Sequence, residues 1–396
     1  MHLIENYSLQ SGQKIKSIDI LPKFYPLDID KYVIFHPWSK SSKCFSYWQD
    51  VVDIILPILQ KEGLSLVQVG LVSEQYIPGC IDLRGKTSLS QVFYLVSKSK
   101  MVLSTDSFCS HLAGHYDIPR VILISNNYSE CVKPWFGDKN KQIILEPDRT
   151  KRKPSFSLDE PYPKQINEIK SEKIAASVCQ LLSLPFDFPY ETVYIGESYH
   201  TKILEMVPNS ITDIRNLGVD SVIVRMDYQF NDQILQHQMQ CCPVSIITDK
   251  PINVEILRNY KPRIKQLFYI ITQYHDVNFA SAVQKLSIPL QMFSYLPEDE
   301  LNKFKLEYLD IGTIFPKTPK SKNDIKELKD VPPEKLFYKS SKTTLDLGKI
   351  FTSRAALLKN QPATVINQIM PIVDDETFFK DLEYCMVLKL KENSLP

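Results

Sequence analysis

The sequence predicts an α/β protein whose mainly parallel sheets form two domains. Short apolar runs alternate with segments in which apolar residues recur at helical spacing, the pattern of strands joined by helices in a parallel sheet. The chain has 396 residues, which is more than one hydrophobic core usually organises. A Pro-rich stretch, PFDFPYE, separates two such alternating series. We therefore expect this stretch to link two domains.

The first domain is expected at residues 31–184, after a lead-in segment at residues 1–30. Continuous apolar runs predict buried strands at residues 32–35, 64–69, 101–104, 120–125 and 142–145. Apolar residues at helical spacing predict helices at residues 47–62, 89–98 and 166–184. Residues 146–165 are basic and Pro-rich, which predicts an irregular surface loop.

The second domain is expected at residues 193–396, after a linker at residues 185–192. The same patterns predict strands at residues 193–195, 221–226, 244–248, 266–271 and 290–293. They predict helices at residues 199–207, 231–240, 252–260 and 276–286. Residues 316–340 are rich in lysine and proline and predict a loop, whereas residues 349–359 and 375–384 predict a helical tail.

Charge and hydrophobicity exclude several function classes. Lysine and arginine number 47 against 46 aspartate and glutamate residues, so there is no general attraction to nucleic acid or anionic lipid. We therefore expect no nucleic-acid partner. No segment approaches the roughly 20 apolar residues of a membrane-spanning helix, and the amino terminus lacks the apolar core of a signal peptide. These observations predict a cytoplasmic protein with no transmembrane segment.

Cysteine and glycine exclude further kinds of site. The eight cysteines show neither C-x-x-C spacing nor a histidine at metal-ligand spacing, so the sequence predicts no metal site. The 11 glycines form neither a Walker loop nor a G-x-G-x-x-G turn, which argues against a P-loop ATPase and a Rossmann dehydrogenase. We expect no cofactor.

The most informative stretch is residues 101–125, MVLSTDSFCSHLAGHYDIPRVILIS. An apolar strand leads into Thr105, Asp106 and Ser107, and a short helix carrying His111 follows. Polar residues at the carboxyl end of a strand lie where open α/β sheets bind ligands, and a helix amino terminus offers free N–H groups to an anion. The stretch has the outline of a phosphate-binding site. The alternative is ordinary helix capping, with His111 facing the sheet.

Four short motifs in the first domain resemble those of glycosyltransferase family 9, the ADP-heptose lipopolysaccharide heptosyltransferases. A strand precedes a loop with Lys43 and Trp48 (FHPWSKSSKCFSYWQDVV), the next strand ends in glycine (VQVG), and a helix begins with GKTSL. The fourth motif is the family's D-[ST]-G-x-x-H-x-A, matched here by Asp106, Ser107, His111 and Ala113. The order and spacing of these motifs cover residues 30–184.

The resemblance implies the GT-B fold, in which two Rossmann-like domains with mainly parallel sheets face a cleft. It also implies the residues that bind a nucleotide-sugar donor: Lys43, Gly85, Lys86, Thr105, Asp106, Ser107 and His111. Lys43 would place a cation on the diphosphate, Ser107 and the amides after it would hydrogen-bond the same group, and His111 would reach the leaving phosphate. The alternative for Lys43 is a solvated lysine, and we expect Trp48 in the core.

One residue departs from the family pattern, because Phe108 stands where the family has glycine. Glycine lets the backbone approach a diphosphate closely, so a phenylalanine here is expected to narrow or reshape the pocket. Catalytic competence depends on how the ring is placed.

The second half does not follow the family's domain order, in which the acceptor domain comes first. Either that domain is lost, or the second half replaces it in permuted order. The segment YIGESYHT at residues 194–201 resembles the family's first strand and G-D-x-x-H-T loop, with Glu197 in place of the aspartate base. On this resemblance Glu197 and His200 are the candidate catalytic residues, and Glu197 would take the proton of the acceptor hydroxyl.

The sequence therefore predicts a glycosyltransferase that is inverting and metal-independent. Its partners would be a nucleotide-diphosphate sugar donor and a glycan or other hydroxyl acceptor. One alternative is a catalytically silent GT-B-like protein that serves in binding or scaffolding. A second alternative is a nucleotide-sugar epimerase of the same fold, which would turn over without an acceptor.

Overall fold

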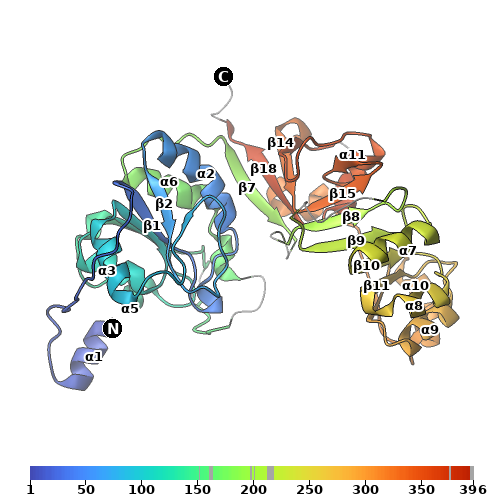
Figure 1. Cartoon of the computed structure of the whole chain (residues 1–396), viewed down its shortest axis with the longest axis horizontal. Coiled ribbons are helices and arrows are strands. Elements are labelled where there is room, and N and C mark those ends of the chain that lie inside the picture. Colours follow the sequence, from blue (N-terminus) through green and yellow to red (C-terminus); the bar gives the residue numbers. More distant parts are fainter. Residues whose placement is uncertain are drawn as a thin grey trace. The chain divides into compact units, whose positions relative to one another are not determined.

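The chain forms two compact units, unit 1 (Met1–Thr192) and unit 2 (Val193–Glu392). The structure is a computed structural model that describes residues 1–150, 152–159, 164–196, 199, 201–211, 218–373 and 376–392. Figure 1 shows that each unit is built of strands and helices of its own. Each unit is described separately below.

Unit 1 is built on a six-stranded sheet with the order β3-β2-β1-β4-β5-β6, and its neighbouring strands are parallel. The five strands predicted from apolar runs are confirmed, and the short strand β3 is added at the edge. The strands are β1 (Tyr32–His36), β2 (Ser65–Gln68), β3 (Ile81–Asp82), β4 (Met101–Thr105), β5 (Arg120–Leu123) and β6 (Gln142–Leu145).

Helices cover both faces of this sheet. Residues of α3 and α4 share a buried apolar cluster with Tyr32 and Ile34 of β1. On the other face, α2 packs beside α6, and the Trp48 ring of α2 lies 5.1 Å from the Phe35 ring. Trp48 is 1% exposed, so its expected place in the core is confirmed. The helices are α1 (Leu3–Ser11), α2 (Trp48–Lys61), α3 (Leu89–Lys98), α4 (Phe108–His115), α5 (Ser129–Val132) and α6 (Ser171–Leu181).

The strand order of unit 1 reverses once. From β1 the chain moves to β2 and β3, and it then crosses back to β4 on the opposite side of β1. Right-handed connections put the helices before and after such a reversal on opposite faces. Open α/β sheets bind their ligands at the carboxyl ends of the two strands where the order reverses, which here are β1 and β4.

Unit 2 contains an eight-stranded sheet with the order β13-β12-β11-β10-β9-β8-β15-β16. From β8 to β13 the strands are parallel and lie in sequence order, while β15 is parallel to β8 and antiparallel to β16. The strands are β8 (Ile203–Met206), β9 (Ser221–Arg225), β10 (Val244–Thr248), β11 (Ile264–Ile270), β12 (Leu290–Ser294), β13 (Ile314–Pro316), β15 (Lys342–Asp346) and β16 (Lys349–Phe351).

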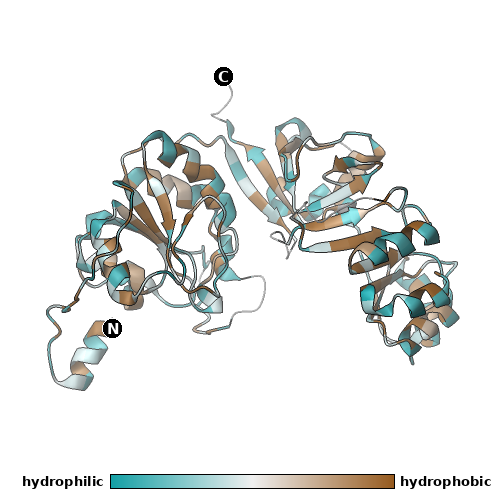
Figure 2. Cartoon of the chain, in the orientation of Figure 1, coloured by the Kyte–Doolittle hydropathy of each residue, from teal (hydrophilic) through white to brown (hydrophobic). Residues whose placement is uncertain are grey.

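The helices between β9 and β13 cover one face of this sheet. A right-handed series that never reverses places its helices on the same side. Alternate strand residues, such as Leu204, Val224 and Leu267, form the apolar core with these helices, and the strands carry much of the hydrophobic colour in Figure 2. The helices are α7 (Asp232–Cys241), α8 (Val254–Asn259), α9 (Val277–Lys285) and α10 (Glu298–Lys305).

The helix predicted at residues 199–207 is wrong, because β8 (Ile203–Met206) occupies this segment. All four residues of β8 are buried. Glu205 makes the run look like part of an amphipathic helix, but its carboxylate is buried in an ion-pair network. A charge that is buried and paired in this way cannot be distinguished in sequence from one that faces solvent.

A four-stranded sheet with the order β17-β14-β18-β7 completes the fold, and β14 is antiparallel to both β17 and β18. The loop predicted at residues 316–340 is therefore wrong at its end, and the predicted tail is helical only in α11 and α12. The elements are β7 (Tyr190–Ile195), β14 (Leu336–Ser340), α11 (Arg354–Leu358), β17 (Met370–Pro371), α12 (Glu376–Asp381) and β18 (Cys385–Leu390).

Gly196, at the end of β7, is required by close packing. Its φ is 88°, and a Cβ atom there would overlap the backbone carbonyl of Glu383. We expect Gly196→Ala to destabilise unit 2 by roughly 2–4 kcal/mol, because the clash with backbone adds to the strain of a positive φ. Thermal unfolding followed by circular dichroism would measure this.

Gly348→Ala is the matched control. Gly348 has a φ of 77°, and nothing lies within 4 Å of the position of its Cβ. This variant should cost only about 1 kcal/mol, from backbone strain alone. Equal losses in the two variants would show that packing against Glu383 is unimportant.

Candidate functional site

The candidate site lies at the carboxyl ends of β1 and β4, where the strand order of unit 1 reverses. β1 ends at His36 and β4 ends at Thr105, and the two strands are paired so that His36 lies beside Ser104. Asp106 and Ser107 follow β4 directly. A third group, Lys43, reaches this edge from the loop after β1.

Lys43 and Asp106 form an ion pair at the centre of this edge. The Lys43 Nζ donates to Asp106 Oδ2 at 2.6 Å, and the side chains are 24% and 7% exposed. The two residues are 63 positions apart in the chain, so only the fold brings them together. The structure thus joins two residues that the sequence predicted for one site.

The loop that carries Lys43 is anchored by hydrogen bonds to residues that lie more than 80 positions later in the chain. Ser42 is buried, and its Oγ accepts a hydrogen bond from Asn126 at 3.2 Å. The Ser42 carbonyl accepts from Ser125 Oγ at 3.2 Å, and the carbonyl of Ser41 accepts from Lys164 Nζ at 2.9 Å. Lys43 is therefore positioned by its backbone as well as by its ion pair.

The amino terminus of α4 has no side-chain cap. Its N-cap residue is Ser107, which makes no capping hydrogen bond; instead the Ser107 Oγ lies 2.8 Å from Nδ1 of His36. The first amides of a helix need a hydrogen-bond acceptor, and the Ser107 side chain does not supply one here. An uncapped helix start of this kind favours an anion.

Sequence reasoning missed His36. It is 5% exposed, and burial lowers the pKa of His36 to about 4, so the ring is neutral at neutral pH. When its Nδ1 donates to Ser107, the serine hydroxyl proton remains available to another acceptor. The signal was present in the sequence as a polar residue directly after an apolar strand, the same pattern that identified Asp106.

His111 lies one helical turn from Ser107, on the same side as Asp106. Its Nε2 is 3.9 Å from Asp106 Oδ1, and 43% of its side chain is exposed. Partial burial of the ring lowers the pKa of His111, although Asp106 opposes this shift. His111 therefore belongs to the cluster around Asp106 and is accessible from solvent.

Phe108 does not separate Lys43 from Asp106, since those two side chains are in direct contact. The Phe108 side chain is 41% exposed, and its ring packs edge to face on His36 with 5.1 Å between centroids. The substitution for glycine therefore adds an exposed aromatic ring at the rim of the site.

Thr105, Gly85 and Lys86 have different surroundings. Thr105 is completely buried, and its Oγ1 has no hydrogen-bond partner among the residues that the structure describes. Gly85 has a φ of 65° and donates its N–H to the carbonyl of Gly70 at 2.8 Å. Lys86 Nζ donates to the carbonyl of Asp82 at 2.7 Å. Gly85 and Lys86 thus stabilise the turn before α3, and their predicted contact with a donor stays a prediction.

The predicted catalytic residues Glu197 and His200 lie outside the described residues, so their roles stay predictions. The strand that precedes them, β7, lies at the edge of the four-stranded sheet. Within the described part of the chain, no group of three or more histidine, cysteine, aspartate or glutamate residues could hold a metal ion. No helix in that part is long and apolar enough to cross a membrane.

A family model supports the resemblance seen in the sequence. Residues 28–164 match the model described as glycosyltransferase family 9 (heptosyltransferase). This segment includes β1 to β6 and all the residues of the candidate site described above. The resemblance to this family is thereby confirmed for the sheet of unit 1. No curated protein matches the chain.

Several solved structures are similar to part of the chain. The glycosyl transferase family 9 protein from Veillonella parvula is 17% identical, with a TM-score of 0.32 over 46% of this chain and 50% of that one. Escherichia coli heptosyltransferase WaaC with ADP is 15% identical, with a TM-score of 0.30 over 39% and 46%. The iron-containing glycosyltransferase TibC from enterotoxigenic E. coli is 12% identical, with a TM-score of 0.34 over 42% and 50%.

The chain thus spans about half the length of the structures it matches.

The buried His36 should make unit 1 less stable in acid. Its pKa is about 4 in the fold and about 6.5 in an unfolded chain. Between these values the unfolded chain binds more protons, so the free energy of unfolding falls as the pH falls. We expect a loss of roughly 2 kcal/mol from pH 7 to pH 5 through this residue, and His36→Gln should remove that contribution.

Urea unfolding followed by tryptophan fluorescence would test this, because all three tryptophans lie in unit 1. His115→Gln is the control, since His115 is a partly exposed histidine of the same unit, at the end of α4. It should retain the pH dependence of the unmodified protein. A pH dependence that is unchanged by His36→Gln would contradict the assignment.

Proposed function

We propose that unit 1 binds the diphosphate of a nucleotide sugar and that the chain transfers the sugar to a hydroxyl acceptor. The observation that carries the proposal is the ion pair of Lys43 with Asp106 beside the uncapped start of α4. A lysine and free helix amides at one strand edge offer both a cation and hydrogen-bond donors to a diphosphate. The family match of residues 28–164 supports the same assignment.

Binding of a donor would change the partners of Lys43. In the ligand-free structure its ammonium group is compensated by Asp106, so a diphosphate would compete with or share this contact. The amides at the start of α4 and the Ser107 hydroxyl would add hydrogen bonds, with His36 holding Ser107 in place. His111, on the exposed side of Asp106, would lie over the phosphate that leaves.

The chemistry proposed is a direct displacement with inversion and without a metal ion. A base removes the proton of the acceptor hydroxyl, the acceptor oxygen bonds to the anomeric carbon, and the bond from that carbon to the diphosphate oxygen breaks. Negative charge then develops on the departing nucleoside diphosphate, where Lys43 and the α4 amides would stabilise it. Glu197 is the base that the family resemblance suggests.

One observation favours a second candidate function, a binding protein without catalysis. Phe108 replaces the glycine of the family motif, and its exposed ring at the rim narrows the approach to α4. A protein of this kind would bind a nucleotide sugar or its diphosphate and transfer nothing.

The diphosphate site can be tested with nucleotide binding. We expect one of ADP, GDP, UDP or CDP, or a sugar derivative of it, to stabilise unit 1 by about 2.7 kcal/mol at a hundred times its dissociation constant. Lys43→Ala should weaken this binding by about tenfold to a hundredfold, the value of a charge-assisted hydrogen bond. Isothermal titration calorimetry would measure it.

Lys40→Ala is the matched control, because Lys40 lies in the same loop and is exposed. It should bind the nucleotide as the unmodified protein does. Equal losses in the two variants, or no stabilisation by any of these compounds, would refute the site.

Transfer can be separated from binding. We expect Glu197→Gln to keep nucleotide binding and to reduce transfer to a hydroxyl acceptor by at least about a hundredfold, because general-base catalysis contributes that much or more. Mass spectrometry of the glycosylated acceptor, with and without a chelator, would measure transfer and its need for metal. Product formed without any acceptor would indicate an epimerase instead, and a protein that binds donor but never turns over would favour the silent module.

A further inference from the structure

The face of the unit 2 sheet opposite its helices carries polar side chains interspersed with apolar ones such as Ile223, Ile247 and Phe293. Alternate residues of the strands point to this face, and they include Glu205, Arg225, Ser245, Gln266 and Lys342. The other face of the same strands carries the apolar core. Polar groups on the inner face of a sheet cost free energy unless they have partners, so their occurrence on successive strands indicates a binding surface.

This face forms the floor of a cavity of about 550 Å³ within unit 2. The volume falls in the range of about 300–1,000 Å³ that is usual for small-molecule sites. Residues 352–354 and 382–384 supply a further wall, including Arg354, Glu383 and Tyr384. All of these residues belong to unit 2.

One end of the cavity lies at the carboxyl ends of the parallel strands. The residues that follow β9, β10, β11, β12 and β13 all line it, and they are Asp227, Asp249, Thr272, Tyr295 and Lys317. The carboxyl ends of parallel strands are where α/β proteins place their ligands. Position in the fold therefore supports the same conclusion as the polar floor.

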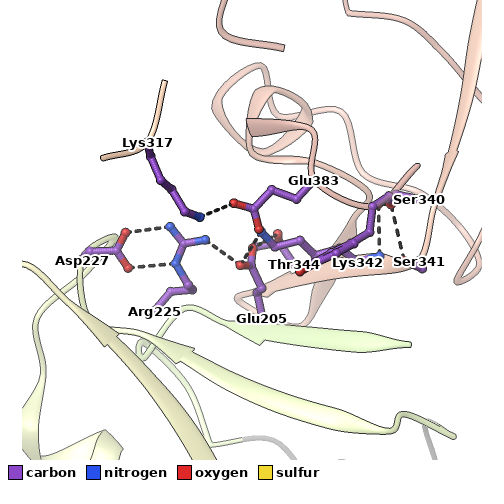
Figure 3. A network of polar contacts seen from close by, with 10 residues as sticks. Glu205, Arg225, Asp227, Lys317, Ser340, Ser341, Lys342, Thr344 and Glu383 are labelled. Carbon is purple, nitrogen blue, oxygen red and sulfur yellow. Dashed lines mark hydrogen bonds and ion pairs between the residues drawn. The ribbon is translucent and has the colours of Figure 1, made fainter. Parts of the chain in front are cut away.

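A buried ion-pair network fixes the charge of the cavity, as Figure 3 shows. Glu205 accepts from Arg225 at 2.6 Å and lies 2.8 Å from Lys342 Nζ. Arg225 also binds Asp227 through two hydrogen bonds of 2.8 and 2.6 Å. Figure 3 further shows Lys317 directed at Glu383, with 2.6 Å between the charged atoms.

These pairs leave little surplus charge for an anion. The lining carries four cations (Arg225, Lys317, Lys342 and Arg354) and four carboxylates (Glu205, Asp227, Asp249 and Glu383), so the cavity has no net positive charge. At Arg225 a phosphate would have to displace the buried carboxylates of Glu205 and Asp227, which is costly. A neutral ligand with hydroxyl groups would displace no carboxylate. Each hydroxyl both donates and accepts hydrogen bonds, so it can bind to cations and carboxylates alike.

Two glutamines and several aromatic rings complete the lining. Gln266 Nε2 donates to Gln291 Oε1 at 3.2 Å. Within the described part of the chain, the side-chain oxygen of Gln266 and the side-chain amide nitrogen of Gln291 have no further hydrogen bond. Phe268 and Tyr295 line the same cavity and offer flat apolar surfaces. Planar polar groups beside aromatic rings suit a sugar, whose hydroxyl edges are polar and whose C–H faces are apolar.

The carboxylates of the network are not suited to cleaving a glycosidic bond. Burial alone would raise the pKa of Glu205, but Lys342 and Arg225 lower it to about 2. Lys342 and Lys317 likewise lower the pKa of Glu383 against the effect of burial. Both groups are ionised at neutral pH, so neither can be the general acid that glycoside hydrolysis requires.

We propose that this cavity of unit 2 binds a neutral carbohydrate. The polar floor, the strand-end position and the compensated charges all concern unit 2 alone, so binding does not depend on the diphosphate site of unit 1. Its use as the site of the sugar acceptor is the further step, and that step rests on the proposed function.

The test is binding of neutral sugars to the full chain in the absence of nucleotide. Glucose, galactose, mannose, N-acetylglucosamine and their disaccharides would be screened by saturation-transfer difference NMR, with inorganic phosphate and ADP for comparison. We expect at least one sugar to bind. Gln266→Met and Asp249→Asn should each weaken the binding of that sugar by at least about tenfold. This is the effect of losing one or two hydrogen bonds to a polar ligand.

Gln233→Met and Asp299→Asn make the same chemical changes at exposed positions on α7 and α10, and they should leave sugar binding unchanged. Lys43→Ala should also leave it unchanged, which separates this proposal from the one for unit 1. The proposal is overturned if none of the sugars binds, or if binding survives both cavity variants. It is also overturned if phosphate or ADP binds instead and Asp249→Asn or Gln266→Met removes that binding.

Discussion

The handedness of strand–helix–strand connections determines where each unit can hold a ligand. In unit 1 the strand order reverses once, between β1 and β4, so helices cover both faces and the strand ends remain as the place for a ligand. In unit 2 the order from β8 to β13 never reverses. Its helices lie on one face, and the other face is open to line a cavity. The same rule thus produces a site at an edge in one unit and on a face in the other.

The two sites also use charge in different ways. In unit 1 Lys43 is paired with one carboxylate and stands beside a helix start that has no side-chain cap, which we propose as an anion site. In unit 2 Glu205 is 1% exposed and contacts two cations. Removing one member of such a network would leave an uncompensated buried charge, so we expect the network to position the cavity walls.

The sequence was most informative where burial on both sides makes strands uniformly apolar. The strands of unit 1 were predicted for that reason, and Lys43, Asp106 and Ser107 were assigned to one site through the family motifs. The strands β8, β14 and β15 were missed because polar residues such as Glu205 and Lys342 interrupt them. Those residues line the cavity, and a strand with one polar face has no continuous apolar run. His36 also follows an apolar strand directly, but its contacts with Ser107 and Phe108 are made only in the folded chain.

The contact between Lys43 and Asp106 has a consequence for selectivity. Because the charge of Lys43 is compensated by Asp106, the proposed site would attract chloride or a single phosphate ion only weakly. A ligand would therefore need several simultaneous contacts to bind, including contacts with the α4 amides and the Ser107 hydroxyl. Selection among anions would then occur at binding, because only a ligand with several contacts can compete with Asp106 for Lys43.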